Sequence, residues 1–507
     1  MPASRSVGLI ALVTAAALHA EDKPLGPMPP SARLNSVARP VISSDMKKQL
    51  GLVPEYENVR DVEHIKVAVL DYGFDGIDGT RPYLPADTVV VEHYDPEFVR
   101  RHNLGDPDFR KGFAPGNKHG RLMAQIVWAV TGQNPRGPQF YLLNANGPTL
   151  LRRAVRYAID MKVDLILFSN TFDGGGNGDG RGPINRIVQE AISAGIIWIN
   201  AAGNHGRHVY RGPLEILNSG YVRLGSARDS SALRFRNLLD DNSITVTLTW
   251  NDYQEVEDAG TTKDLDLYVE DWQGQVIGSS ELRQVAGSRK TADGETHNPR
   301  ERLVLPGLAA DRDHDYRIRI RPRAGAFAAD DRLRVLVTAT RDGKTPDPQS
   351  GNPIDAVQFP DASDGGEIFP PADHPLVITV GDSGNESSVG PTMDHRVKPD
   401  VVLRSSDALF TDGEMTSGAS NAAAYFAGVV ALLKAAEPRL EVRHLLELAR
   451  QSKMSSATTT VRRVSTTSTA QPVRDRIIQR RLWHTPTRRE LSDTVRTSQV
   501  QTPIKRP

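Results

Sequence analysis

The sequence predicts an α/β protein whose doubly wound parallel sheet is interrupted by an all-β antiparallel sandwich domain. Residues 61–220 alternate continuous apolar strands with amphipathic helices, which indicates a parallel sheet covered on both faces. Residues 221–350 carry short strands between Gly, Asp and Asn turns, which is typical of a sandwich or jelly roll. The first pattern returns in residues 351–450, so we expect the sandwich to be inserted into the α/β domain.

The first part of the α/β domain is expected to contain five buried strands, because five short runs are apolar and bounded by polar or turn residues. These strands cover residues 65–70, 88–94, 139–145, 164–169 and 195–201. Stretches of helical periodicity fall between them, around residues 119–131, 149–161 and 184–194. Further along, residues 374–382 and 398–403 have the same strand character and precede a helix that is apolar on every side.

The inserted sandwich is predicted from strands in which apolar and polar residues alternate. Its clearest strands read SITVTLTW, DLDLYVE, GQVIGSS, YRIRIRP and LRVLVTAT. Alternation of this kind suits a sheet with one face on a core and one face toward solvent.

The two ends of the chain differ from its middle. Residues 1–20 combine Arg5, an apolar stretch and a final small residue, which predicts a secretory signal peptide and an exported protein; a disordered apolar N-terminus is the alternative. Residues 21–60 indicate a linker or a short pro-segment. Residues 451–507 hold twelve Lys or Arg against three Asp or Glu, which indicates a poorly ordered basic tail or, alternatively, a basic binding arm.

The composition is that of a soluble globular protein, and 507 residues predict two or three domains. The 62 basic residues balance the 62 acidic residues, which gives no reason to expect nucleic acid as a partner. No run after the predicted signal is long enough to expect membrane insertion. The chain has no Cys, which excludes disulfides, thiol catalysis and Cys-ligated zinc and fits an exported bacterial protein.

Three polar residues stand where the α/β domain is expected to place its site. Asp71 ends the first buried strand, where a doubly wound sheet presents its ligand site. His119 opens a helix, and Ser417 stands at the start of the apolar helix. If these residues meet, the carboxylate can orient the imidazole and the imidazole can take the hydroxyl proton. Each also has a plainer interpretation: Asp71 and Ser417 as caps, and His119 as a structural histidine.

The order Asp, His, Ser and the residues around these positions resemble the subtilase family of serine proteases. VAVLDYGFDG resembles the strand of the catalytic Asp, HGRLMA resembles the HGTxVA helix, and MTSGAS resembles the GTSMAS nucleophile motif. AAGN is similar to the segment of the oxyanion-hole Asn, a role that the resemblance gives to Asn204; a turn residue is the alternative. The resemblance implies a subtilisin-like fold and covers residues 61–206 and 374–436.

The resemblance extends to the substrate cleft and to the insert. VDLILFSNT is similar to the family strand that pairs with the substrate backbone, so Ser169, Asn170 and Thr171 are expected to line the cleft. LTWND, DLDLYVEDWQGQVIGSS and HNPRERLVL resemble the β-sandwich that follows the catalytic domain in some large bacterial subtilases. Here it lies between Asn204 and Ser417, where we expect it to stabilise the enzyme or to limit substrate access.

Four positions depart from the family motifs. Met415 replaces the usual Gly before Thr-Ser, Gly418 replaces the Met after the serine, and Asn421 replaces the Pro that follows. Arg121 replaces the Thr after His-Gly. Because Gly permits backbone conformations that other residues avoid, its loss at position 415 can restrict a tight turn. These changes put catalytic efficiency in question.

No cofactor is expected. The Gly-rich stretch 173–182 offers Asp173, Asn177 and Asp179 as oxygen ligands for calcium, which makes calcium possible without the support of a specific motif. Its spacing matches no EF-hand, and a flexible loop beside the cleft is the preferred interpretation.

The expected function is that of a serine endopeptidase acting on proteins or peptides, with Ser417 as nucleophile, His119 as base, Asp71 as orienting group and Asn204 in the oxyanion hole. The altered nucleophile motif motivates a second hypothesis, an inactive subtilase fold retained as a binding or scaffold protein. A third hypothesis, an esterase of the α/β-hydrolase type, is disfavoured because Ser417 lacks a GxSxG elbow and follows the histidine.

Overall fold

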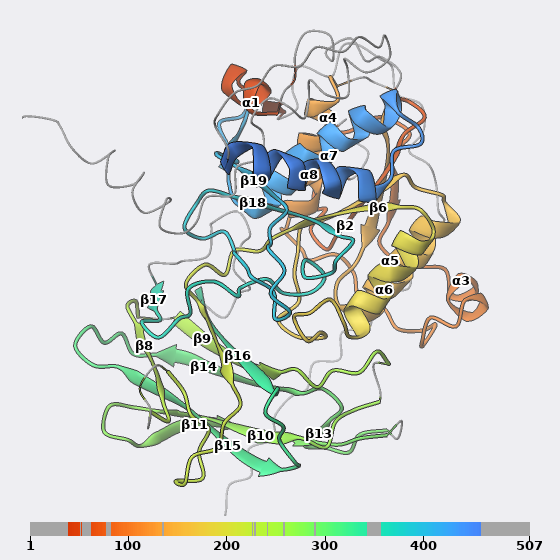
Figure 1. Ribbon diagram of the computed structural model, residues 1–507. Helices are drawn as coiled ribbons and strands as arrows, with labels where there is room; N and C mark the ends of the chain where they lie inside the picture. Colours follow the sequence, from red (N-terminus) through yellow and green to blue (C-terminus); the bar gives the residue numbers. More distant parts are fainter. Residues whose placement is uncertain are drawn as a thin grey trace, which may run out of the picture.

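The computed structural model describes residues 39–50, 52, 62–77, 83–133, 136–225, 227, 230–240, 242–256, 259–287, 290–341 and 356–457. The predicted signal peptide, residues 1–20, and all residues after 457 lie outside this set. In Figure 1, helices surround a parallel sheet in the upper part of the molecule, and antiparallel sheets form the lower part. The predicted fold class is confirmed.

The upper part is built on a seven-stranded sheet in the order β19-β18-β6-β5-β2-β4-β3, and every neighbouring pair in it is parallel. The inner strand β2 has β4 on one side and β5 on the other, so the strand order reverses there and its carboxyl end is the expected ligand site. The strands are β2 (Lys66–Asp71), β3 (Val89–Val91), β4 (Gln139–Asn144), β5 (Leu165–Phe168), β6 (Ile197–Ala201), β18 (Ile378–Asp382) and β19 (Val401–Leu403).

Helices cover both faces of this sheet because alternate residues of its strands point to opposite sides. Val67 and Val69 of β2 face a core shared with α4 (His119–Val130), α7 (Ala419–Ala436) and α8 (Val442–Ala457). Ala68 and Leu70 face a second core shared with α3 (Pro96–Arg101), α5 (Pro148–Asp160) and α6 (Pro183–Ser193). Among the described helices, α7 alone is long and apolar enough to cross a membrane, but 78% of it is buried. It is a core helix here.

The lower part is a sandwich of two antiparallel sheets that enclose a core of their own. One sheet has the order β11-β10-β15-β8-β17 and the other β14-β9-β16-β7. Their bounds are β7 (Val209–Pro213), β8 (Leu233–Asn237), β9 (Asn242–Trp250), β10 (Asp264–Glu270), β11 (Val276–Ser280), β14 (Arg300–Leu308), β15 (Tyr316–Ala324), β16 (Arg332–Arg341) and β17 (Val357–Gln358). Two short strands, β12 (Arg283–Gln284) and β13 (Glu295–Thr296), pair beside it.

The sandwich uses residues on both sides of the predicted segment 221–350. Its first strand, β7, pairs with β16, and β17 pairs with β8. Neither strand has a local signal in the sequence, because β17 has only two residues and β7, which reads VYRGP, has no continuous or alternating apolar run. At the other end of the protein, α8 runs to Ala457, so the chain is still helical past residue 450, where the tail was predicted to begin.

A small antiparallel sheet ties the start of the described chain to the residues before Ser417. Its order is β1-β20-β21, and the strands are β1 (Pro40–Val41), β20 (Ala408–Phe410) and β21 (Met415–Thr416). The helix α1 (Ser44–Gln49) follows β1 and buries Met46 in the core of the α/β part. This piece of the predicted linker, residues 39–50, is therefore an integral part of the fold.

Candidate active site

Asp71 ends β2, and its carboxylate is held from four directions. One oxygen, Oδ1, accepts hydrogen bonds from the backbone N–H groups of Tyr72 and Gly73 at 2.7 and 3.0 Å. The other, Oδ2, accepts a hydrogen bond from Asn170 Nδ2 at 3.1 Å and lies 2.7 Å from His119 Nδ1. The side chain is only 1% exposed. Asp71 thus caps a turn with one oxygen and faces the imidazole with the other.

His119 is the first residue of α4 and is 4% exposed. Its backbone N–H donates to Asn117 Oδ1 at 2.9 Å, which fixes the start of the helix. A Cβ on Gly120 would lie 2.5 Å from Asp71 Cβ and 2.6 Å from the Phe74 ring, so this glycine allows α4 to approach β2. Because the carboxylate can only accept, Nδ1 carries the proton and Nε2 is left as an acceptor.

Ser417 lies between β21 and α7, and its side chain is exposed. The N-cap of α7 is Gly418, with φ of 110° and no side-chain capping hydrogen bond, so the interpretation of Ser417 as an N-cap is wrong. Within the described part of the chain, Ser417 Oγ makes no hydrogen bond. The backbone N–H of Gly418 donates to Ser406 Oγ at 2.8 Å. The loop is therefore fixed through its neighbours while the hydroxyl faces solvent.

The residues that depart from the family motif have defined contacts. Asn421 Nδ2 donates to Thr416 Oγ1 at 3.0 Å and to the carbonyl of Ser406 at 2.9 Å, so it braces the loop on both sides of Ser417. Met415 belongs to β21, and its side chain is 66% exposed. A side chain at position 415 therefore meets solvent and not a crowded turn.

Asn204 follows β6 and touches the start of α7. Its Oδ1 accepts a hydrogen bond from the backbone N–H of Ala419 at 3.2 Å. A Cβ on Gly418 would lie 3.3 Å from Asn204 Nδ2, which places the amide nitrogen beside the residue after Ser417. A larger side chain at position 418 would crowd this amide.

The loop that carries Asn204 is clamped by a second loop. The backbone N–H of Ser388 donates to the carbonyl of Gly203 at 2.8 Å, and Ser388 Oγ accepts from the backbone N–H of His205 at 3.0 Å. The backbone N–H of Gly206 donates to the carbonyl of Glu386 at 2.9 Å. No motif in the sequence pointed to this clamp, because its two halves are separated by the whole sandwich.

The three predicted cleft residues adjoin the same site. Ser169 is buried, and its carbonyl accepts a hydrogen bond from Ser420 Oγ at 3.1 Å. Asn170 donates to Asp71, a contact that the sequence did not predict. Thr171 Oγ1 lies 3.2 Å from His205 Nε2. Their role in binding substrate stays a prediction.

An ion pair joins the two sides of the site. Lys118, the residue before His119, lies 2.6 Å from Glu414 on the hairpin that leads to Ser417, and these side chains are 32% and 20% exposed. Arg121 has other direct contacts: its Nη1 donates to the carbonyl of Asp75 at 2.7 Å, and its guanidinium lies 4.3 Å over the Tyr83 ring. Neither contact has a signal in the sequence.

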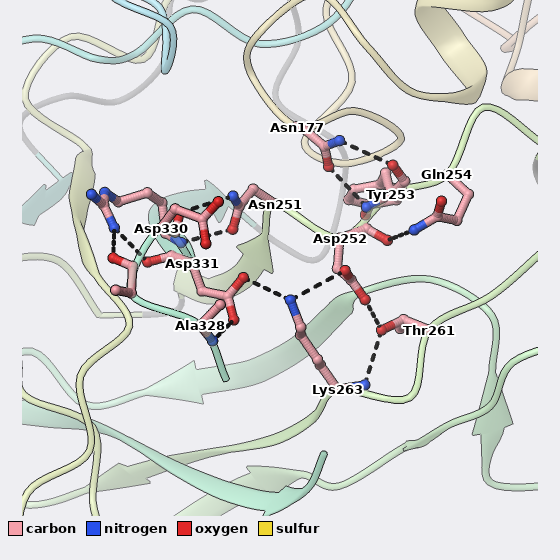
Figure 2. A network of polar contacts seen from close by, with 12 residues as sticks. Asn177, Asn251, Asp252, Tyr253, Gln254, Thr261, Lys263, Ala328, Asp330 and Asp331 are labelled. Carbon is pink, nitrogen blue, oxygen red and sulfur yellow. Dashed lines mark hydrogen bonds and ion pairs between the residues drawn. The ribbon is translucent and has the colours of Figure 1, made fainter. Parts of the chain in front are cut away.

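The Gly-rich loop 173–182 contacts the sandwich. Asp173 Oδ1 lies 3.4 Å from Arg300 Nη1, and Asp179 Oδ2 lies 2.8 Å from Arg181 Nη2. Asn177 makes two hydrogen bonds with the backbone of Tyr253, as Figure 2 shows. The three oxygen-bearing side chains are thus each engaged by the protein. Among the described residues, no group of three or more His, Cys, Asp or Glu is arranged to hold a metal ion.

The structure brings the predicted residues together in two groups. Asp71, His119 and Asn170 are in direct contact, and Asn204 contacts the start of α7 next to Ser417. The helices behind the two groups pack closely, since a Cβ on Gly428 of α7 would lie 2.5 Å from Val130 Cβ of α4. A buried carboxylate and imidazole, an exposed hydroxyl and an amide are the groups that acyl transfer requires.

The family model described as "Subtilase family" matches residues 63–477. The solved structure of the Clostridium perfringens CspB protease is 16% identical and covers 88% of this chain and 100% of that chain, with a TM-score of 0.51. MycP1 from the ESX-1 type VII secretion system is 14% identical over 83% of this chain and 80% of that chain, with a TM-score of 0.35. None of the curated proteins compared matches this chain.

Proposed function

Because this chain belongs to the subtilase family and is a subtilisin-like serine endopeptidase, we propose that Ser417, His119 and Asp71 carry out its reaction, with Asn204 as an oxyanion donor. The observation that carries this proposal is the buried contact of 2.7 Å between His119 Nδ1 and Asp71 Oδ2. It supports an imidazole held in one tautomer and ready to accept a proton on Nε2. The substrates are proteins or peptides, as the family implies.

The reaction follows from the properties of these groups. Nε2 of His119 takes the proton of Ser417 Oγ while this oxygen attacks the scissile carbonyl carbon. The imidazolium is stabilised by the Asp71 carboxylate, and it then gives the proton to the nitrogen of the leaving amine. In the second half of the reaction, His119 takes a proton from water while the water oxygen attacks the acyl carbon. The bond between this carbon and Ser417 Oγ then breaks, and the imidazolium returns the proton to Oγ.

Negative charge on the carbonyl oxygen needs donors that are already in place. We assign this role to Asn204 Nδ2 and to the backbone N–H of Ser417. The hydrogen bond from Ala419 N–H to Asn204 Oδ1 supports the assignment, because it fixes this oxygen as the acceptor, and the amide nitrogen, which is the donor, lies beside Gly418, the residue after Ser417. We further propose that the backbone of Ser169, Asn170 and Thr171 pairs with the substrate, since this segment adjoins Asp71 and His205.

The function is tested by casein cleavage and by labelling with a serine-directed phosphonate. The wild-type protein should cleave and be labelled, whereas Ser417→Ala should do neither. Ser193→Ala is the matched control, because Ser193 is an exposed serine at the end of α6, and it should behave like the wild type. A folded wild-type protein that neither cleaves nor is labelled would support the scaffold hypothesis in place of this one.

We also propose that the protein is exported, on the basis of the signal-like residues 1–20. The protein recovered from the periplasm or the medium should have lost these residues, as N-terminal sequencing would show. An intact N-terminus on protein that stays in the cytoplasm would contradict the proposal.

A further inference from the structure

A side chain of the sandwich is buried against the α/β part of the protein. Arg334 belongs to β16, is 3% exposed, and donates from Nη1 to the carbonyl of Ile368 at 3.0 Å. Its Nη2 donates to the carbonyl of Gly176 at 3.4 Å, and its guanidinium lies 4.2 Å from the centre of the Phe369 ring. This cation therefore bridges the two parts of the molecule.

The contacts of Arg334 continue toward the proposed site. The Phe369 ring meets the His205 ring edge-on, with 5.3 Å between the ring centres. His205 directly follows Asn204, and its Nε2 lies 3.2 Å from Thr171 Oγ1. A chain of packed side chains thus leads from the sandwich to the residue after the proposed oxyanion donor and to the proposed cleft segment.

Burying the charged Arg334 side chain at this position has a desolvation cost. Within the described part of the chain, no carboxylate lies within ion-pair distance of it. Two carbonyl groups and an aromatic ring contact the guanidinium, and the charges of Asp373 and Asp179 act on it from further away. Burial lowers the pKa of Arg334, as expected for a cation removed from water. An apolar side chain of similar size would avoid this desolvation cost, so stability alone does not account for an arginine here.

We propose that Arg334 is a positioning residue for the peptidase reaction: the sandwich uses it to hold Phe369 and His205, and through them Asn204 and Thr171. The guanidinium fork fixes the backbone at Ile368 and the ring at Phe369 at the same time, which Lys cannot do because it lacks a planar fork. This inference rests on the proposed function of Asn204.

A second connection between the two parts provides the matched control. Asn177 accepts from the backbone N–H of Tyr253 at 2.8 Å and donates to its carbonyl at 3.0 Å. Figure 2 shows this pair beside a sandwich network in which Lys263 bridges Asp252 and Asp331. None of the hydrogen bonds of Asn177 reaches Phe369 or His205, so Asn177→Ala weakens the contact between the two parts without cutting the proposed chain.

The experiment measures kcat and KM on a chromogenic peptide together with the melting temperature of full-length variants. Arg334→Met should lower kcat by about tenfold or more, because small misplacements of catalytic groups are costly, with KM changed less than about twofold. Arg334→Lys should not restore kcat, although it restores the charge. Asn177→Ala should lower the melting temperature and keep kcat within about twofold of the wild type. A lower melting temperature with unchanged kcat for Arg334→Met would overturn the proposal.

A second variant and the activity of the wild type distinguish the remaining outcomes. If Arg334→Met does not fold, His205→Gln cuts the same chain while keeping a donor for Thr171, and it should show the same loss of kcat; an unchanged kcat would overturn the proposal. If the wild type neither cleaves peptide nor reacts with the phosphonate, the proposed function fails, and the positioning role fails with it. If the wild type is active and Arg334→Met is equally active, the positioning role alone fails.

Discussion

At the scale of single residues, the amide of Asn204 has two distinct tasks. Its oxygen accepts a hydrogen bond from Ala419 N–H and so anchors the loop on α7. Its nitrogen is the group that we assign to the oxyanion. The two tasks can be separated by substitution, because aspartate keeps the acceptor oxygen and loses the donor.

We predict that Asn204→Asp and Asn204→Ala both lower kcat by about 10²- to 10³-fold, the usual cost of removing one oxyanion donor. The aspartate variant should keep the melting temperature closer to that of the wild type, because its oxygen can still accept from Ala419. Steady-state kinetics and thermal unfolding of the two variants check this. Activity of Asn204→Asp near the wild-type level would contradict the assignment.

At the scale of elements, the site depends on how α4 meets the hairpin formed by β20 and β21. Lys118 and Glu414 join them at 2.6 Å, immediately before His119 and close to Ser417. The pair is partly exposed, and ion pairs of this kind contribute about 0.2–1 kcal/mol. The contact is therefore a modest constraint on how closely His119, the proposed base, approaches Ser417, the proposed nucleophile.

We predict that Lys118→Glu and Glu414→Lys each lower kcat by about 1.5- to 5-fold, the range that corresponds to this energy. The double variant Lys118→Glu/Glu414→Lys should recover most of the loss, because it restores an attractive pair with reversed polarity. High salt should reduce the difference between the wild type and the single variants, since it screens exposed charges. A double variant no better than the worse single variant would exclude this role.

At the scale of the whole molecule, the sandwich is inserted without breaking the parallel sheet. Strand β6 precedes the sandwich and β18 follows it, yet the two are neighbours, with Ile199 opposite Ile378. The ends of the insert are therefore brought together by the sheet itself. Histidines of the α/β part that are removed from water link the stability of the whole molecule to pH.

His205 is one of these histidines. Burial, and then the charge of His208, lower the pKa of His205 to about 4 from an ordinary value of 6.5. The unfolded chain thus binds one more proton than the folded protein at this site between pH 4 and 6.5. Stability rises with pH where the unfolded state binds more protons, so His205 destabilises the protein increasingly as the pH falls through this window.

We predict that the stability of His205→Gln relative to the wild type increases on acidification from pH 6.5 to 4, by at most about 1.4 kcal/mol per pH unit. Other titrating groups are common to both proteins, so the difference isolates His205. Denaturant unfolding at several pH values measures it. His374, whose pKa is also lowered to about 4, chiefly by burial, provides a second variant, His374→Gln, with the same expected trend. If the free energy of unfolding of both variants differs from that of the wild type by an amount that does not change with pH, burial of these histidines does not link stability to pH.

The sequence by itself determined the buried strands of the α/β part, four of its helices (α4, α5, α6 and α7) and the residues at their ends, whereas α1, α3 and α8 were not predicted. The pattern of apolar residues is local. A buried strand is a continuous apolar run, and α4 has apolar residues at helical spacing, whichever strands or helices pack against them. The placement of Asp71 after a buried strand follows from the same pattern. The subtilase motifs then led to His119, Asn204 and Ser417 as site residues.

Only the tertiary structure decided how these residues are held. The strands β1 and β17 have two residues each, and β7 has no apolar run, so no local pattern predicts them; all three pair with distant partners. The same applies to Lys118 with Glu414, to Asn170 with Asp71, and to the contact of Arg334 with the Phe369 ring. Each is a contact between side chains from different elements. It forms only when these elements pack together, so no local sequence pattern indicates it.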